Sequence, residues 1–251
     1  MANRDLDTIS DDLGSPTRIT ESHSADLDTQ ITTAKKNPRD IHKFFKKIEQ
    51  YATITDDIAA SCFYKLKRKS KDGDKFIEGP SIRFAELVAA TYGNLRVDGG
   101  PVRDDEEFTY SQGVAWDLEE NVAFRVVSRR RITTNEGRRY GVDMVATTSN
   151  AATSIAMRNA IFRVVPRALW EPVIEKVKRV AVGTEAQFAE RRQKMMEYFT
   201  QKLRVPVEKI LQYLEIPNLE SMKLEHLETL RGVATSIKDG ETTVEKEFLH
   251  S

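Results

Sequence analysis

Regularly spaced basic side chains are the residues of this chain most able to do chemistry. Lysine and arginine neutralise phosphate groups, and each such contact releases condensed counterions. The first cluster consists of Lys65, Lys67, Arg68 and Lys69, and the second of Arg125, Arg129, Arg131, Arg138 and Arg139. Both clusters fall on predicted strands and turns, so we expect them to contribute to a phosphate-binding surface.

Strand alternation sharpens this expectation for the run 122–132. Side chains point alternately to the two faces of a strand. One face then carries Arg125, Arg129 and Arg131, and the other is mostly apolar. The alternative interpretation is an ordinary solvated strand whose positive charge discourages edge-to-edge pairing.

A further candidate lies in the stretch 147–170, which predicts a long alanine-rich helix ended by Pro166. Its alanines allow close approach to a sheet, and Arg158 borders the apolar stripe, so this arginine cannot be fully solvated. Arg163 projects about 140° away from it, at about 100° per residue, and is not expected to grip the same phosphate. Arg158 is predicted to meet an anion. The alternative is a structural ion pair with Glu86 or Asp143.

Aromatic and acidic residues suggest two further kinds of site. Tyr140 follows Arg138 and Arg139 in a predicted turn and is the best candidate for stacking on a base, whereas most other aromatic residues are expected in the core. Asp104, Asp105 or Asp117 could hold a metal in a nuclease, but consecutive acids are more typical of a solvated turn. The chain has no phosphate-loop motif. We expect no catalytic residue, no metal and no cofactor.

The elements that must position these residues alternate between helices and strands. Helices are expected at 41–51, 55–62, 81–93, 147–165 and 172–180, a hairpin at 63–77 with its turn at 71–74, and strands at 94–97, 107–118 and 122–132. Three more helices are expected at 185–203, 205–214 and 224–237. The predicted fold class is α+β: an antiparallel sheet with a basic hairpin packed on a long alanine-rich helix, plus a small C-terminal helical bundle.

Charge is distributed unevenly along a chain whose net charge is zero. Residues 1–34 carry a net charge of −5, residues 35–180 carry +7, and residues 181–251 carry −2. The predicted organisation is a disordered acidic tail at 1–34, a DNA-binding core at 35–182, a helical module at 183–240 and a frayed tail at 241–251. A basic module between acidic ends is typical of a protein with a polyanionic partner.

Composition also bears on the cellular compartment. No apolar run approaches the ~18 residues of a membrane span, and the N-terminus lacks the apolar core of a secretory signal. Cys62 is the single cysteine, and the four histidines have no metal-ligand spacing. These features predict a cytoplasmic protein that does not interact with membranes.

Three segments carry a resemblance to a known family: 79–86 (GPSIRFAE), 115–119 (AWDLE) and 153–161 (TSIAMRNAI). Together with the order of elements, they resemble the phage-type single-strand annealing recombinases of the RecT and Red beta group. The resemblance implies binding of single-stranded DNA and of the nascent duplex without nucleotide or metal, in rings or filaments of identical subunits. It implies that Arg158 contacts the DNA backbone, and that residues 183–240 recruit host single-strand-binding protein or a phage exonuclease.

The expected function is therefore annealing of complementary DNA strands during phage or prophage recombination. Two alternatives remain open from the sequence. One is a metal-dependent DNA nuclease that uses the aspartates named above. The other is a non-enzymatic assembly or interaction protein whose basic face meets an acidic protein.

Overall fold

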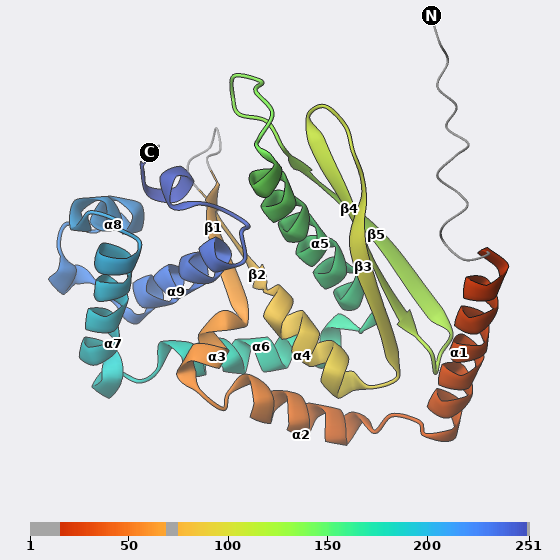
Figure 1. Ribbon diagram of the computed structural model, residues 1–251. Helices are drawn as coiled ribbons and strands as arrows, with labels where there is room; N and C mark the ends of the chain where they lie inside the picture. Colours follow the sequence, from red (N-terminus) through yellow and green to blue (C-terminus); the bar gives the residue numbers. More distant parts are fainter. Residues whose placement is uncertain (1–15, 69–74, 250–251) are drawn as a thin grey trace, which may run out of the picture.

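The structure is a computed structural model that describes residues 16–68 and 75–249 (Figure 1). It confirms an α+β fold with antiparallel sheets and a C-terminal helical region. The elements up to residue 182 are α1 (Pro16–Lys36), α2 (Ile41–Ala52), α3 (Asp56–Ser61), β1 (Phe63–Arg68), β2 (Lys75–Pro80), α4 (Ile82–Tyr92), β3 (Leu95–Asp104), β4 (Phe108–Asp117), β5 (Val122–Arg131), α5 (Val142–Val164) and α6 (Arg167–Val182). They are followed by α7 (Glu185–Glu197) with a π-helical extension (Tyr198–Lys202), α8 (Val207–Leu214), a 3-10 turn (Leu219–Ser221), α9 (Leu224–Lys238) and a π-helical turn (Glu245–Leu249).

Helix α5 lies along one face of the antiparallel sheet β3-β4-β5 at very short range. A Cβ atom built on Gly113, in the middle of β4, would come within 2.3 Å of the Ala156 carbonyl carbon. Near the start of α5, the Ser149 carbonyl accepts a hydrogen bond from the Ser111 hydroxyl at 3.2 Å. These contacts occur in the same order along both elements, so α5 runs parallel to β4. Small residues on both sides permit this spacing, as the alanine-rich helix predicts.

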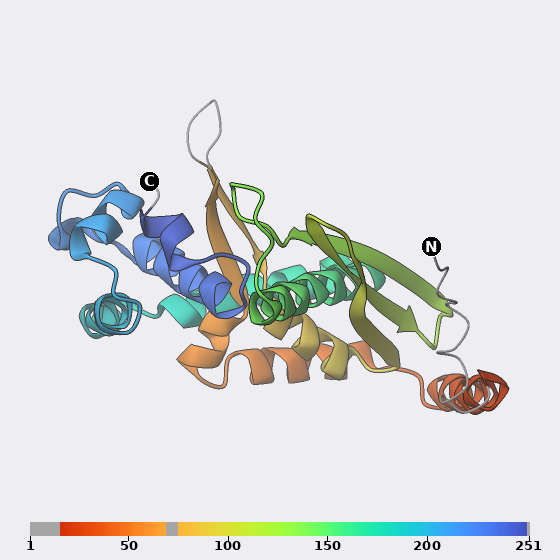
Figure 2. The ribbon, with the colours of Figure 1, turned by 45° about the horizontal axis from the view of Figure 1, so that its top comes forward.

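Helices α2, α4 and α6 complete the main hydrophobic core on the side of α5 away from the sheet (Figures 1 and 2). The Phe84 side chain of α4 is fully buried, and its ring stacks on Phe162 of α5 with centroids 6.2 Å apart. Local signals fix where two of the helices begin. The Asp40 carboxylate accepts a hydrogen bond from the Lys43 N–H, and the Ser81 hydroxyl accepts one from the Phe84 N–H.

The hairpin β1–β2 joins this core to the C-terminal helices. Helix α9 packs along β1, where a Cβ atom on Gly232 would lie 2.6 Å from the Lys65 Cβ. A second cluster of buried residues around Phe199, Ile210 and Phe248 fills the space between α7, α8, α9 and the final turn. In Figure 1 these helices gather at one end of the molecule, and α1 stands at the other.

The terminal segments are more ordered than the sequence analysis predicts. Residues 16–34, expected within a disordered tail, belong to α1, and residues 1–15 lie outside the described part. Residues 241–249 were expected to fray, but Phe248 is 1% exposed in the second core. The Glu247 carboxylate also accepts hydrogen bonds from Tyr213 and Thr242. Burial of an aromatic ring and a satisfied carboxylate fixes this segment in place.

Several element boundaries also differ from expectation. Strand β3 extends to Asp104 because its whole length pairs with β4, whereas only 94–97 was expected. Helix α5 begins at Val142, five residues before the expected start, and α6 begins directly after Pro166 although Pro172 lies within it. The expected hairpin turn at 71–74 and Lys69 lie outside the described residues.

Within the described ranges, none of the helices combines the length and apolar character that crossing a bilayer requires.

Candidate nucleic-acid interface

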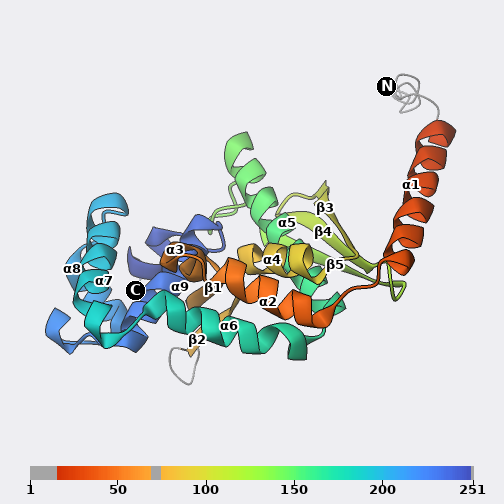
Figure 3. The same cartoon turned by 90° about the horizontal axis from the view of Figure 1, so that it is seen from below.

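The sheet β3-β4-β5 has one covered face and one open face. Strand β4 alternates strictly between small or polar residues that are buried under α5 and larger residues that are partly exposed. The buried set is Thr109, Ser111, Gly113, Ala115 and Asp117, and the partly exposed set is Phe108, Tyr110, Gln112, Val114 and Trp116. Helix α1 lies on the side of the sheet away from α5 (Figures 1 and 3) and contacts it near the start of β3, where Arg96 Nη1 donates a hydrogen bond to the Gln30 side-chain oxygen at 3.3 Å.

Arginines on the neighbouring strands flank the aromatic residues of the open face. On β5, Arg131 pairs with Phe108, and Arg129 pairs with Tyr110. On β3, Arg103 pairs with Tyr110. We define the arginine–aromatic face as the residues Arg96, Arg103, Phe108, Tyr110, Trp116, Arg125, Arg129 and Arg131.

Guanidinium groups of this face lie over its rings. The Arg103 guanidinium carbon lies 3.9 Å from the centroid of the Tyr110 ring. The corresponding distances from Arg129 and Arg131 to the Phe108 ring are 5.1 and 5.4 Å. These are favourable cation–π geometries that orient the arginines without neutralising them. The face therefore presents positive charge and flat apolar rings side by side.

Carboxylates near this face are few and lie mainly at its turn end. Asp98 shares the open side of β3, while the Arg103–Asp105 and Arg131–Glu107 ion pairs join nitrogen and oxygen at 3.8 and 3.7 Å. All the arginines and carboxylates of these two pairs remain at least 37% exposed. Exposed pairs of this length are weak, so a phosphate group can compete for the arginines.

The strand alternation placed three sequence-predicted residues on this face. Arg125, Arg129 and Arg131 are exposed on the open side of β5, as the spacing predicts. Sequence analysis did not identify the row of aromatic residues on β4, because it assigned most aromatic residues to the core. The signal was present in FTYSQGVAWD, where every second position is small or polar and leaves the aromatic residues on the other face.

The loop after β5 holds three more predicted residues next to the turn end of β4. Arg139 forms an ion pair with Asp104 at 3.6 Å, and its Nη1 donates a hydrogen bond to the Asp105 carbonyl. Arg138 is exposed, and the Tyr140 ring is partly buried. Arg138 is therefore open to solvent, whereas Arg139 also fastens the loop to the turn between β3 and β4.

The hairpin lysines do not form the open basic surface that the sequence predicts. Lys65 forms an ion pair with Glu78 at 3.5 Å, and Lys67 forms one with Glu215 at 2.7 Å. Both lysine side chains are at most 16% exposed, because α9 packs against this strand and Lys67 Nζ also donates a hydrogen bond to the Tyr213 carbonyl of α8. Arg68 is exposed at the end of the described part of β1, and Lys69 lies outside the described residues.

Arg158 is buried rather than presented to solvent. Its guanidinium carbon lies 4.6 Å from the centroid of the Tyr64 ring, and its Nη1 forms a short ion pair with Glu241. The partner is neither Glu86 nor Asp143, the two residues considered above for a structural ion pair with Arg158. The placement does not support the expected contact with a DNA backbone, because the C-terminal segment folds over α5 and neutralises the guanidinium. Arg163 is exposed on another side of the helix.

A second arginine approaches Glu241 from the sheet. Arg130 Nη2 donates a hydrogen bond to the Glu241 carbonyl at 3.2 Å. Burial lowers the pKa of Arg130, although the Glu241 charge opposes the shift. Burial raises the pKa of Glu241, against the effect of Arg158. Glu241 thus links the sheet and α5 in a region shielded from solvent.

The aspartates proposed for a nuclease are divided between the two ends of the sheet. Asp104 pairs with Thr109 at one end of the β3–β4 ladder, and Asp117 pairs with Leu95 at the other. Asp117 and Glu119 hold Arg39, whose side chain is 7% exposed. Among the described residues, no three histidine, cysteine or acidic side chains come together as metal ligands would. This geometry gives the nuclease alternative no support.

Comparisons with known proteins found no matching family model, no matching curated protein and no matching solved structure.

Proposed function

We propose that this protein binds single-stranded DNA across the arginine–aromatic face and anneals complementary strands. The observation that carries the proposal is the aromatic row of β4 flanked by exposed arginines on both neighbouring strands. Proteins that bind single strands combine cations that follow the backbone with rings on which bases stack. A duplex keeps its bases stacked inside, so exposed rings favour a single strand.

Annealing follows from how such a surface would hold a strand. Rings contact a base through its flat face, which leaves the hydrogen-bonding edge available to a complementary strand. The arginines neutralise phosphates and reduce the repulsion between two strands, so base pairing supplies the specificity. This mechanism uses no nucleotide hydrolysis and no metal. The resemblance to the RecT and Red beta group supports the same activity. On this proposal the protein assembles into rings or filaments and acts in the cytoplasm.

The C-terminal helices are proposed to serve a partner rather than the DNA. Residues 183–251 are slightly acidic, and the lysines of the adjoining hairpin are held in ion pairs. A host single-strand-binding protein or a phage exonuclease is the partner that the resemblance implies. On this proposal, removal of charge from α7 or α8 leaves DNA affinity unchanged.

Replacement of the three β5 arginines tests the proposal. The triple variant Arg125→Gln, Arg129→Gln, Arg131→Gln is expected to bind a labelled oligonucleotide at least ~10-fold more weakly, because three phosphate contacts are lost. Its salt dependence should also flatten, by about 0.7 per contact in the slope of log K against log salt. Fluorescence anisotropy measures both, and dequenching of labelled complementary strands measures annealing.

A matched control separates this effect from loss of charge alone. Arg167 on α6 is 73% exposed and lies in an ion pair with Glu171, on a different element from the sheet. Arg167→Gln is expected to bind and anneal as the unmodified protein does. Unchanged affinity and salt slope in the triple variant would reject the arginine–aromatic face as the DNA site.

A further inference from the structure

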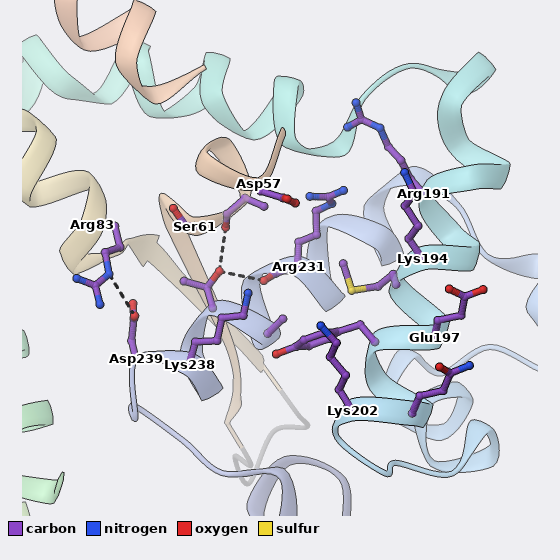
Figure 4. A pocket seen from close by; sticks show the side chains of 16 residues that line it. Asp57, Ser61, Arg83, Arg191, Lys194, Glu197, Lys202, Arg231, Lys238 and Asp239 are labelled. Atoms are coloured by element: carbon purple, nitrogen blue, oxygen red, sulfur yellow. Dashed lines mark hydrogen bonds and ion pairs between the residues drawn. The ribbon is translucent and has the colours of Figure 1, made fainter. Parts of the chain in front are cut away.

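A cavity of about 620 Å³ lies where the core meets the C-terminal helices (Figure 4). Its walls come from α3, from the start of α4, from α7 with its π-helical extension, and from the last turns of α9. Basic side chains dominate its polar lining: Arg83, Arg191, Lys194, Lys202, Arg231 and Lys238, against Asp57, Glu197 and Asp239. A cavity of this size matches the range of small-molecule sites, roughly 300–1,000 Å³.

Arg231 and Arg191 are the buried cations of this cavity, and of the two only Arg231 lacks an ion pair among the described residues. The residue is 9% exposed, and its Nε has no hydrogen-bond partner among the described residues. It also forms no ion pair with a carboxylate in the described part of the chain. Burial lowers the pKa of Arg231, and the neighbouring Arg191 adds to the shift, while the charges of Asp57 and Asp56 oppose it. A buried guanidinium without a partner is unfavourable, so its position on the cavity wall indicates an anionic ligand.

The other basic residues of the cavity differ in whether they already have interaction partners within the protein. Arg191 forms an ion pair with Asp56 and donates to the carbonyls of Val180 and Ala181, so it is structural. Lys238 is exposed, and its Nζ lies 5.3 Å from the centroid of the Tyr198 ring. Lys202 is exposed on the π-helical extension of α7. Figure 4 shows the Lys202 and Lys238 side chains on the cavity wall near Arg231.

Asp239 supplies an acceptor in the same cavity. Its Oδ2 is buried without a hydrogen-bond partner among the described residues, while its Oδ1 lies 3.8 Å from the Arg83 Nε. Burial raises the pKa of Asp239. The cavity thus combines an unsatisfied donor, an unsatisfied acceptor and an aromatic ring. A ligand with an anionic group and a hydrogen-bond donor would complement the Arg231 guanidinium and the Asp239 carboxyl group of this lining.

We propose that this junction cavity binds a phosphate-bearing ligand of nucleotide size, with the phosphate group at Arg231 and a ligand N–H or O–H at Asp239. The ligand is either a free nucleotide or the 5′-phosphorylated end of a DNA strand. This site does not depend on the arginine–aromatic face, which lies on the other side of α5 from the hairpin and α9. Occupation would fasten α7 and α9 to α3, so it would couple the C-terminal helices to the core.

Calorimetric and thermal titrations of the full chain test the proposal. Deoxyadenosine monophosphate is expected to give saturable heat and a concentration-dependent rise in Tm, because a ligand that binds only the folded state stabilises it. Deoxyadenosine, which lacks only the phosphate, should bind at least ~10-fold more weakly, as expected from the loss of a charge-assisted contact. Inorganic phosphate tests the anion contact alone. A 5′-phosphorylated oligonucleotide that binds more tightly than its 5′-hydroxyl form would identify the strand end as the ligand.

Variants of the cavity separate a binding role from a structural one. Arg231→Met is expected to abolish the nucleotide-dependent rise in Tm and to raise the Tm of the ligand-free protein, because a buried unpaired charge is removed. Lys202→Met with Lys238→Met, on the exposed wall, should weaken binding ~10-fold without lowering the ligand-free Tm. Lys246→Met, which is exposed outside the cavity, is the matched control and should bind normally.

Three outcomes would overturn the proposal. The first is that neither the nucleotide nor inorganic phosphate produces heat or a change in Tm with the unmodified protein. The second is that deoxyadenosine binds as tightly as deoxyadenosine monophosphate. The third is that the double lysine variant and Arg231→Met both keep the unmodified affinity. Loss of oligonucleotide binding by the β5 arginine variant, with intact nucleotide binding here, would show that the two sites are separate.

Discussion

Arginine and lysine side chains have opposite environments on the two sides of α5. On the open face of the sheet, Arg125 and Arg129 are exposed and no ion pair holds them among the described residues. On the other side, Arg158 is buried against Tyr64 and Glu241, and Lys67 is held by Glu215. Charge alone therefore does not identify a binding surface. What distinguishes the two sides is whether other segments of the chain bury the cation with its carboxylate, since the pairs Arg103–Asp105 and Arg131–Glu107 on the open face stay exposed.

The comparison predicts that the buried side controls stability and the open side controls binding. A buried charge that loses its partner lowers the free energy of unfolding by several kcal/mol. An exposed arginine contributes little to stability but can contribute a phosphate contact. The following variants test this division, from the largest expected effect to the smallest.

Glu241→Leu should have the largest effect. The Arg158 and Glu241 side chains are 10% and 9% exposed, so the variant leaves an unpaired guanidinium in the interior. We expect a loss of about 4 kcal/mol in the free energy of unfolding, measured by urea denaturation. The double variant Arg158→Met, Glu241→Leu should recover most of it, and its folded form should bind single-stranded DNA normally. Weakened DNA binding by the folded double variant would instead place Arg158 in the DNA site.

Arg39→Met should destabilise the far end of the sheet by about 3 kcal/mol, because Asp117 is left buried without its partner. The same cluster predicts a pH dependence. Burial alone would raise the pKa of Asp117 and Glu119, but hydrogen bonds from Arg39 and neighbouring groups lower both below their ordinary values.

The sign of that pH dependence follows from linkage. A carboxylate with a lowered pKa in the folded state stabilises the protein above its ordinary pKa, near pH 4, and the contribution is lost as pH falls through the lower folded value. Urea denaturation between about pH 7 and pH 2.5 should show this loss in the unmodified protein and a smaller one in Arg39→Met. Parallel curves for the two proteins would contradict the prediction.

Tyr110→Ala tests the open face. Loss of one stacked base costs about 1–3 kcal/mol, so the affinity for a labelled single strand should fall between about 5-fold and 150-fold. Stability should change little, because the ring is partly exposed. Tyr51→Ala is the matched control, since Tyr51 is 43% exposed on α2. Equal affinities for the two variants would remove the stacking role.

Glu215→Gln should have the smallest effect. Glu215 is 70% exposed in its pair with Lys67, so the pair contributes at most about 1 kcal/mol. We expect unchanged affinity for single-stranded DNA, measured by anisotropy at low salt. A several-fold gain in affinity would mean that the hairpin lysines, once released, belong to the DNA-binding surface.

Local features of the sequence predicted much of the fold. The N-cap residues Asp40 and Ser81 mark where α2 and α4 begin. Alternation on β5 correctly separated its basic face from its apolar face. These predictions succeeded because the interactions involved are local. The alanine-rich helix was also recognisable, since close packing on a sheet requires small residues.

Long-range partners could not be predicted in the same way. The carboxylate that pairs with Arg158 belongs to Glu241, 83 positions away in a segment that was expected to fray. The aromatic row of β4 was missed because aromatic residues are usually buried, and only the sheet shows which face α5 covers. The cavity around Arg231 depends on how α7 packs on α9, which no local pattern encodes.

The link between Arg158 and Glu241 has a consequence for how the protein folds. Helix α5 can dock on the sheet early, because the strands that precede it are close in sequence. The Arg158 guanidinium of α5 is neutralised only when Glu241, 83 positions further along the chain, reaches it. Closing a loop of that length costs conformational entropy before the contact can form. The last step to the native state is therefore expected to be the docking of the 240–249 segment. The pair between Glu241 and Arg158 would then hold α5 in its position on the sheet.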